Sequence, residues 1–370
     1  MDKRTLKKRI LESLTSARDT ANGSKASVRE AHLPQRRLRR LSEASWLDAH
    51  GSDARRFFAE AKAVRPAAIQ PRVVEVFANT PEAELFRAAT SLWSVPVSRG
   101  YGRRMRFLVM DDANDKLIGL FALGDPVFNL KTRDEWIGWD VSARKERIAS
   151  IMDLFVCGAV PPYTSLLGGK LVASLATSRE VTERFAEKYK GRTGLISGVE
   201  KTARLLVITT TSALGRSSLY NRLTLHTDPP VRFTKIGSTK GWGHFPISDE
   251  VFIELRDLLA REGHPYANGY FFGTGPNWRL RTIRAGMQSL GLDQSLLAHG
   301  IQREVYASEL VPSATRQLRT KISTRRVVRP SAAEISTAAL ERWIIPRYER
   351  SGILPWTQRD IDGMLSLDPD

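Results

Sequence analysis

The chain has 370 residues, of which 42% are hydrophobic and 26% charged, and its formal net charge at pH 7 is +17. This composition excludes a wholly disordered chain, and the single cysteine, Cys157, excludes an intramolecular disulfide, Cys-based zinc sites and CxxC redox chemistry. Because the sequence has neither an apolar run of about 18 residues nor an apolar segment behind its charged N-terminus, we expect a cytoplasmic protein without membrane helix or secretory signal.

Residues 1–70 are expected to form a basic helical region. Residues 1–45 contain 12 Lys or Arg against 5 Asp or Glu, and the segment 35–41 is densely basic. One face of the first predicted helix carries four apolar residues, which are Leu6, Ile10, Leu11 and Leu14. Asn-Gly-Ser at 22–24 ends that helix, and a further helix is predicted at 53–64. The region is either a solvated helix face or an arm that lies on phosphates, and we favour the arm.

Residues 71–245 alternate between predicted strands and helices. Runs of apolar and β-branched residues predict strands at 73–77, 106–110, 117–123, 151–156, 204–210 and 232–236. Helices are predicted between them, at 82–93, 166–176 and 217–223. The polar sequence at 111–115 joins the second and third strands in a hairpin. The alternation predicts an α/β fold with a mixed sheet and flanking helices.

Helices dominate the prediction for the C-terminal part of the chain. They are expected at 249–261 and 278–290 within a basic region, 246–330, and at 333–345 within a last region, 331–370, that ends in a tail. The predicted fold is thus an α/β core with helical extensions at both ends.

A nucleic-acid site is predicted near residue 280. Residues 269–275 interleave aromatics with glycines, and residues 277–329 contain 10 Lys or Arg against 3 Asp or Glu. The helix has an apolar stripe that leaves its arginines on a polar face; the stripe is Leu280, Ile283, Met287 and Leu290. Aromatic rings stack on bases and arginines hold phosphates, although an aromatic core under a solvated helix would give the same pattern. The predicted contacts are Arg103, Arg104, Arg216, Lys240, Trp278, Arg279, Arg281, Arg284 and Arg303.

Three stretches of sequence resemble a known family. They are GRRMRFL at 102–108 continuing through IGL at 118–120, TTTSALGRSSLYNRL at 209–223, and GYFFGTGPNWRLR at 269–281 followed by HGIQREVY at 299–306. They are similar to the Druantia antiphage protein A family over about residues 75–320. The resemblance implies a component of a multi-gene antiphage system with a helicase-like partner, and it implies no particular reaction. Together with the charge, it favours nucleic acid, and DNA above RNA, as the partner.

The order of elements in residues 71–245 also resembles the GNAT-type acyltransferase fold. That resemblance implies an acyl-CoA phosphate site at the start of the helix after the fourth strand, here Gly168, Gly169 and Lys170. The Arg/Gln-x-x-Gly-x-Gly/Ala spacing is absent, so acetyl-CoA is not assigned as a cofactor and the glycines serve equally well for tight packing. Tyr220 stands where such enzymes place a general acid, and Ser217 beside it is either part of that site or a helix cap.

Three functions follow, and whether the protein is an enzyme stays open. The first is a nucleic-acid-binding subunit of an antiphage system, and the second is an acyltransferase that modifies a nucleobase or a protein. The third is a magnesium-dependent nuclease that would use Asp111, Asp112 and Asp153. Two of these aspartates fall in a predicted hairpin turn, where aspartate is common, and the histidines lack metal-binding spacing, so no metal site is assigned.

Overall fold

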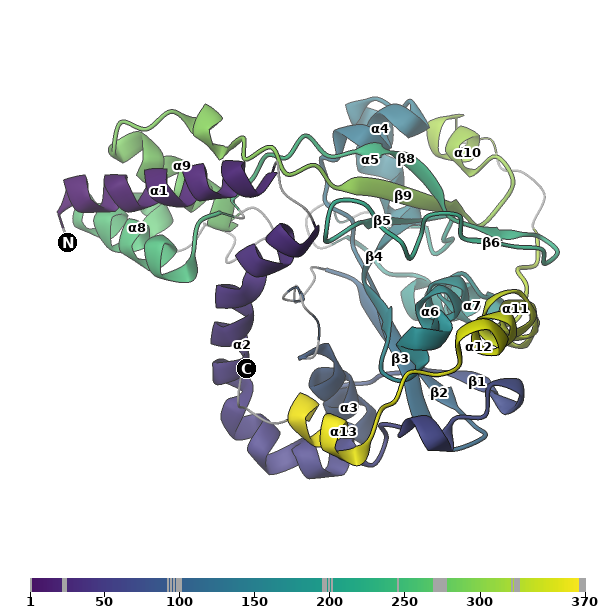
Figure 1. Ribbon diagram of the computed structural model, residues 1–370. Helices are drawn as coiled ribbons and strands as arrows, with labels where there is room; N and C mark the ends of the chain where they lie inside the picture. Colours follow the sequence, from purple (N-terminus) through teal and green to yellow (C-terminus); the bar gives the residue numbers. More distant parts are fainter. Residues whose placement is uncertain are drawn as a thin grey trace. The chain divides into compact units, whose positions relative to one another are not determined.

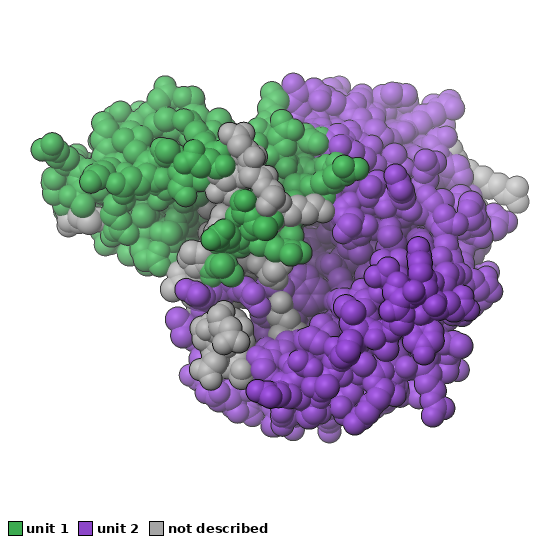
Figure 2. Space-filling model, viewed as in Figure 1, with its two compact units in different colours: residues 1–35, 213–216, 238–304 green, residues 36–212, 217–237, 305–370 purple. Residues whose placement is uncertain are grey.

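A computed structural model gives the fold (Figure 1). It describes residues 2–21, 25–91, 93, 95, 97, 102–194, 198, 200, 202–244, 246–268, 278–320, 322 and 327–365. The chain divides into two compact units, shown in separate colours in Figure 2. The first unit consists of residues 1–35, 213–216 and 238–304, and the second of residues 36–212, 217–237 and 305–370.

A seven-stranded sheet has the order β1-β2-β3-β4-β5-β9-β8. The strands are β1 (Pro71–Glu75), β2 (Arg104–Asp111), β3 (Lys116–Gly124), β4 (Ile151–Ala159), β5 (Val207–Thr211), β8 (Thr234–Ser238) and β9 (Glu304–Glu309). The pairs β1–β2, β2–β3, β3–β4 and β5–β9 are antiparallel, whereas β4 and β5 are parallel. The predicted α/β fold with a mixed sheet is therefore confirmed. A separate two-stranded ribbon joins β6 (Thr224–Leu225) to β7 (Val231–Arg232).

The predicted hairpin is formed by β2 and β3. Its turn is stabilised by Asp111, whose carboxylate Oδ1 accepts hydrogen bonds from the backbone N–H groups of Gln70 at 2.9 Å and Ala113 at 3.1 Å. Asp115 adopts a left-handed φ of 56°, which aspartate tolerates better than most residues. The prediction of a hairpin turn at 111–115 is thus confirmed.

Helices cover both faces of the sheet (Figure 1). Side chains alternate between the faces along each strand, so Phe107 faces one core and Leu108 the other. One core lies under α6 (Gly168–Leu175), α7 (Arg179–Tyr189) and α11 (Ala332–Ala339). The opposite face packs on α3 (Pro81–Thr90) and the later part of α2 (Lys25–Arg55), and also on α4 (Lys131–Ile137), α5 (Val141–Arg147) and α10 (Ala314–Thr320).

Several predicted elements differ from the structure. The helix predicted at 53–64 is wrong, because α2 ends at Arg55 and only a short 3-10 helix, Ala61–Ala63, follows. Residues 217–223 form turns instead of a helix: the Ser217 hydroxyl accepts two backbone N–H groups and Arg222 has a φ of 57°. The helix predicted at 333–345 is α11, continued by a π-helical turn, Leu340–Ile344, and by α12 (Ile345–Ser351). The predicted elements include no counterpart of β9, α4, α5, α7, α10 or α13 (Gln358–Leu365).

The first unit is built on three helices, α1 (Lys3–Ala21), α8 (Asp249–Arg261) and α9 (Trp278–Ser289). Their shared core buries Leu6, Ile10, Leu14, Val251, Phe252, Leu255, Leu258, Ile283 and Met287. Gly286 permits the close approach of α9 to α8, because a Cβ there would lie 2.5 Å from Leu255 Cδ2. The expectation that the N-terminal segment is an arm outside the fold is wrong for α1. No helix in the described ranges is both long and apolar enough to cross a membrane.

The packing of α1 predicts unequal effects of two neighbouring substitutions. Ile10 is fully buried, whereas Leu11 is 37% exposed. Ile10→Ala should lower the free energy of unfolding by about 2–4 kcal/mol, because it leaves a cavity against α8 and α9. Leu11→Ala is the matched control and should cost less than about 1 kcal/mol. Urea denaturation measures both, and equal effects would mean that α1 is not part of this core.

Candidate functional sites

The predicted arginines of α9 have different environments. Arg279 is bound within its own unit, since its guanidinium donates to Asp249 Oδ1 at 2.6 Å and to the Ile247 carbonyl at 2.8 Å, and it lies over the Phe252 ring. Arg281 and Arg284 are exposed, although Arg284 Nε donates to Gln294 Oε1 at 2.5 Å. Trp278 packs edge-on against Phe252, with ring centroids 5.2 Å apart. The aromatic-glycine segment that was part of the same prediction, 269–277, lies outside the described residues.

Acidic residues of α8 and its C-cap residue, Glu262, form ion pairs with basic residues of the neighbouring helices. Glu254 pairs with Arg9 of α1, and Glu262 pairs with Lys3 of α1 at 2.7 Å. Together with the Arg279–Asp249 pair, these contacts tie α1 and α9 to α8. Arg4 and Lys8 of α1 remain exposed, Lys8 with Glu12 at 3.8 Å. The exposed positive charge of this unit is therefore smaller than its sequence suggests.

The remaining predicted nucleic-acid contacts are spread over both units. Arg216 and Lys240 are exposed in loops of the first unit, and Arg104 is exposed on β2. Arg103 points inward instead: its Nε donates to Asp125 Oδ1 at 2.8 Å and its NH1 to the Ala149 carbonyl at 2.8 Å. Arg303 is half-buried, and burial lowers the pKa of its guanidinium.

Tyr220 and Ser217 lie in the turn after β5. The Tyr220 ring is buried between Phe233 and Tyr306, with centroids 5.3 and 5.5 Å away. Burial, and then the neighbouring Cys157, raise the pKa of the Tyr220 phenol well above its usual value. Such a phenol gives up its proton reluctantly, and Ser217 Oγ is engaged as an acceptor from the N–H groups of Leu219 and Tyr220 at 3.1 and 3.2 Å. Catalytic roles for the two residues stay predictions.

The start of α6 is covered by the same turn. A Cβ on Gly169 would lie 2.8 Å from Leu219 Cδ1, and one on Gly168 would lie 2.7 Å from the Tyr163 carbonyl oxygen. Lys170 Nζ donates to the carbonyls of Leu219 and Asn221, each at 3.0 Å. The residues predicted to hold a cofactor phosphate therefore have an internal use, which is to anchor the turn that contains Tyr220.

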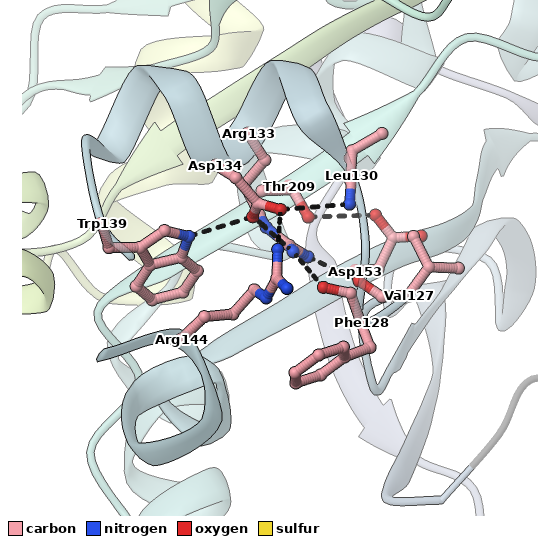
Figure 3. Close-up of polar contacts among 9 residues, drawn as sticks. All are labelled: Val127, Phe128, Leu130, Arg133, Asp134, Trp139, Arg144, Asp153 and Thr209. Atoms are coloured by element: carbon pink, nitrogen blue, oxygen red, sulfur yellow. Dashed lines mark hydrogen bonds and ion pairs between the residues drawn. The ribbon is translucent and has the colours of Figure 1, made fainter. Parts of the chain in front are cut away.

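A buried ionic cluster that the sequence analysis missed lies on the opposite face of the sheet, next to α4 (Figure 3). Arg133 is the largest fully buried side chain among the described residues, and it pairs with Asp134 Oδ1 at 2.6 Å. Asp134 also accepts bonds from Trp139 Nε1 at 3.0 Å, Arg144 NH1 at 2.7 Å and the Leu130 N–H at 3.3 Å. No sequence pattern marked it, because a buried arginine breaks the rule that charged residues are exposed.

Asp153 of β4 lies beside this cluster. Its Oδ1 accepts the Thr209 hydroxyl at 3.1 Å across the parallel β4–β5 pair. Burial raises the pKa of Asp153 to about 6, against the opposing effects of the Thr209 hydrogen bond and the Arg133 charge. Carboxyls whose pKa is raised in this way occur at functional sites and also in structural ionic networks.

The magnesium ligands considered for a nuclease are not assembled. Asp111 is used by the hairpin turn and by the Tyr163 hydroxyl at 2.8 Å, and Asp112 pairs with Arg72 at 2.8 Å. Within the described ranges, no three His, Cys, Asp or Glu side chains are grouped as metal ligands would be.

Comparison with known proteins assigns the family. The family model described as Druantia protein DruA matches residues 22–320. The chain belongs to this family. It is also similar to the Druantia protein DruA of Escherichia coli (strain UMEA 4076-1), with 46% identity over 374 residues that cover 98% of this chain and 92% of the relative. No solved structure matches the chain.

The DruA family match is longer than the motifs suggested. It begins at residue 22 instead of about residue 75, and so includes all of α2 as well as the sheet. The ionic cluster and α9 both fall within the matched range, whereas α1 precedes it.

The raised pKa of Asp153 predicts a pH-dependent contribution to stability in this DruA family member. An unfolded aspartate titrates near 3.9, so the folded chain holds the Asp153 proton more tightly, and stability is lost as pH rises from about 4 through about 6. Asp153→Asn keeps an oxygen for the Thr209 bond and removes the titration. Between pH 4 and 7, the natural chain should lose on the order of 2–3 kcal/mol relative to the variant.

Urea denaturation across that pH range measures this difference. The matched control is Asp134→Asn, which removes the partner of Arg133 and Arg144 and should cost about 3–5 kcal/mol at every pH. A constant difference between the natural chain and Asp153→Asn would show that Asp153 titrates normally.

Proposed function

We propose that this chain is a nucleic-acid-binding component of a Druantia antiphage system. Membership of the DruA family supports the system, and the exposed arginines of α9, Arg281 and Arg284, support the binding. The net charge of +17 favours a polyanionic partner, and DNA is the partner we favour. Within such a system the chain would act with other Druantia proteins, including a helicase-like one.

The ion pairs of the first unit decide which of its arginines are proposed as phosphate contacts. Arg279 is held by Asp249 and the Ile247 carbonyl, so we assign it to the packing of α9 on α8. Arg281 and Arg284 follow on the exposed side of the same helix, three residues apart, which places them on one face. Phosphate contacts of this kind would give affinity without base specificity.

The proposal predicts the salt dependence of binding. Each arginine on a phosphate releases condensed counterions, so Arg281→Gln with Arg284→Gln should weaken duplex DNA binding. The slope of log affinity against log salt should flatten by about two units, roughly one for each contact. Gln is close to Arg in helix propensity, so α9 should stay folded. Fluorescence anisotropy at several salt concentrations measures the slope.

The matched control removes the same charge elsewhere. Arg350 and Arg359 are exposed arginines of the second unit, and Arg350→Gln with Arg359→Gln should leave the slope nearly unchanged. If both double variants flatten the slope equally, net charge and not α9 determines binding. If neither does, the phosphate contacts lie elsewhere.

We infer, in addition, that the sheet is a GNAT-like core. The order β1, α3, the β2–β3 hairpin, β4, α6 and β5 supports this, as it is the order that suggested the likeness. Two departures bear on activity: α4 and α5 are inserted before β4, and turns replace the helix expected after β5. The core would therefore have a GNAT-like framework without a GNAT-like cofactor site.

We expect no tight acetyl-CoA binding. A phosphate at the start of α6 would have to displace Leu219 and the Lys170 bonds that hold the turn. Isothermal titration calorimetry should show no micromolar binding, with an active GNAT acetyltransferase as the positive control. A micromolar dissociation constant would favour the acyltransferase hypothesis instead.

A further inference from the structure

We propose that Phe128, backed by Arg144, is a stacking site for an unpaired nucleobase, so that the chain binds single-stranded nucleic acid at this position. The inference rests on the proposed nucleic-acid function and adds a second site and a strand preference to it.

The site has an exposed apolar tip. Val127 and Phe128 lie in the loop between β3 and α4 and are 53% and 39% exposed. Val141, at the start of α5, is 55% exposed and lies one helical turn before Arg144. The contact of Arg144 with the Phe128 ring links α5 to this loop, and exposed apolar side chains commonly mark a binding surface.

The backbone of this tip is held by the buried cluster. Arg133 NH1 donates to the Val127 carbonyl at 2.7 Å, and its NH2 donates to the Phe128 carbonyl at 2.8 Å (Figure 3). Asp134, which fixes Arg133, also accepts the Leu130 N–H. The buried guanidinium therefore holds two successive carbonyls of the loop, and its partner Asp134 holds the Leu130 N–H.

Burying a guanidinium costs desolvation free energy, so stability alone does not account for Arg133, and the loop that it holds suggests another role. A buried ion pair is often no more stabilising than apolar residues of the same size. The Arg133–Asp134 pair fixes the backbone of the loop. A rigid loop loses little conformational entropy when one of its side chains binds a ligand.

Arg144 completes the site. Its guanidinium lies over the Phe128 ring, with Cζ 4.5 Å from the centroid, and is held there by Asp134 Oδ2 at 2.7 Å. Aromatic rings and arginine planes both stack on unpaired bases. Lys145, the next residue on α5, is exposed and can reach a phosphate, and exposed Asn129 in the loop can reach a base edge.

The size and charge of the surface favour a nucleobase over a protein. A stable protein interface buries about 800 Å² on each partner. Three exposed apolar side chains are too few for such an interface, whereas a nucleobase needs only one ring face on which to stack. A base in duplex DNA is covered by its neighbours on both sides, so the site requires a single strand.

The test uses the full chain with a mixed-sequence single strand that carries one fluorescent adenine analogue, and with the same sequence as duplex. Phe128→Leu keeps the apolar contact but removes the ring, and it should weaken single-strand binding about 5- to 100-fold while duplex affinity stays unchanged. Phe128→Trp restores a stacking ring and should retain single-strand affinity and the quenching of the analogue. Phe77→Leu is the control, since Phe77 is 51% exposed and also has an arginine over its ring.

The other outcomes overturn the inference. Single-strand binding by Phe128→Leu as tight as that of the natural chain would point to a protein contact or to no contact. Equal losses for Phe128→Leu and Phe128→Trp, or for single strand and duplex, would exclude stacking. Thermal unfolding of each variant shows that the fold is kept. If the α9 variant weakens binding while the Phe128 variants do not, the proposed function stands and only the stacking site fails.

Discussion

The short parallel pairing of β4 with β5 is the constraint on which both candidate sites in the sheet depend. It joins Ile151–Asp153 to Val207–Thr209, while β4 runs on to Ala159. On one face, this pairing brings Thr209 to Asp153, next to the Arg133 cluster. On the other face, beyond the pairing, Thr210 Oγ1 bonds to the Leu154 carbonyl and the Tyr220 phenol bonds to Thr210 and Cys157. Side-chain hydrogen bonds thus connect β4 and β5 beyond the last paired backbone residues.

The side-chain bonds beyond the β4–β5 pairing bear on the proposed GNAT-like core, because the turn that contributes Tyr220 also contacts the start of α6, where such a core would place its cofactor. The Tyr220 phenol bonds to Cys157 of β4, and Lys170 fixes the turn that contains Tyr220 by binding two of its carbonyls. Opening the start of α6 for a phosphate would expose Tyr220, whose ring is packed against Phe233 and Tyr306. The glycines at 168 and 169 then serve close packing, which was one of the two readings that their sequence allowed.

Local patterns were sufficient for part of the fold. The helix predicted at 249–261 is α8 to the residue, because a Ser248 cap and an apolar face are both local signals, and the β2–β3 hairpin has an equally local turn. Strand β9 was missed because Glu and Ala, which are depleted in strands, make up half of its six residues. Helices α4 and α5 have seven residues each, too few to establish a period. The ionic cluster needed the partners of Arg133, which sequence alone does not give.

The net charge of +17 has to be interpreted with the structure, because the sequence does not show which charged side chains have partners inside the fold. Several arginines have partners inside the fold. Arg133 pairs with Asp134 and Arg279 with Asp249. Arg329, which is 6% exposed, donates to the Thr177 carbonyl. Burial lowers the pKa of Arg329 to about 10, still well above neutral pH, so it stays charged yet cannot reach a phosphate. The number of phosphates that a basic protein neutralises is set by its exposed cations, not by its net charge. Within α9, Arg279 is therefore assigned to packing on α8, whereas the exposed Arg281 and Arg284 are the arginines proposed to contact phosphate.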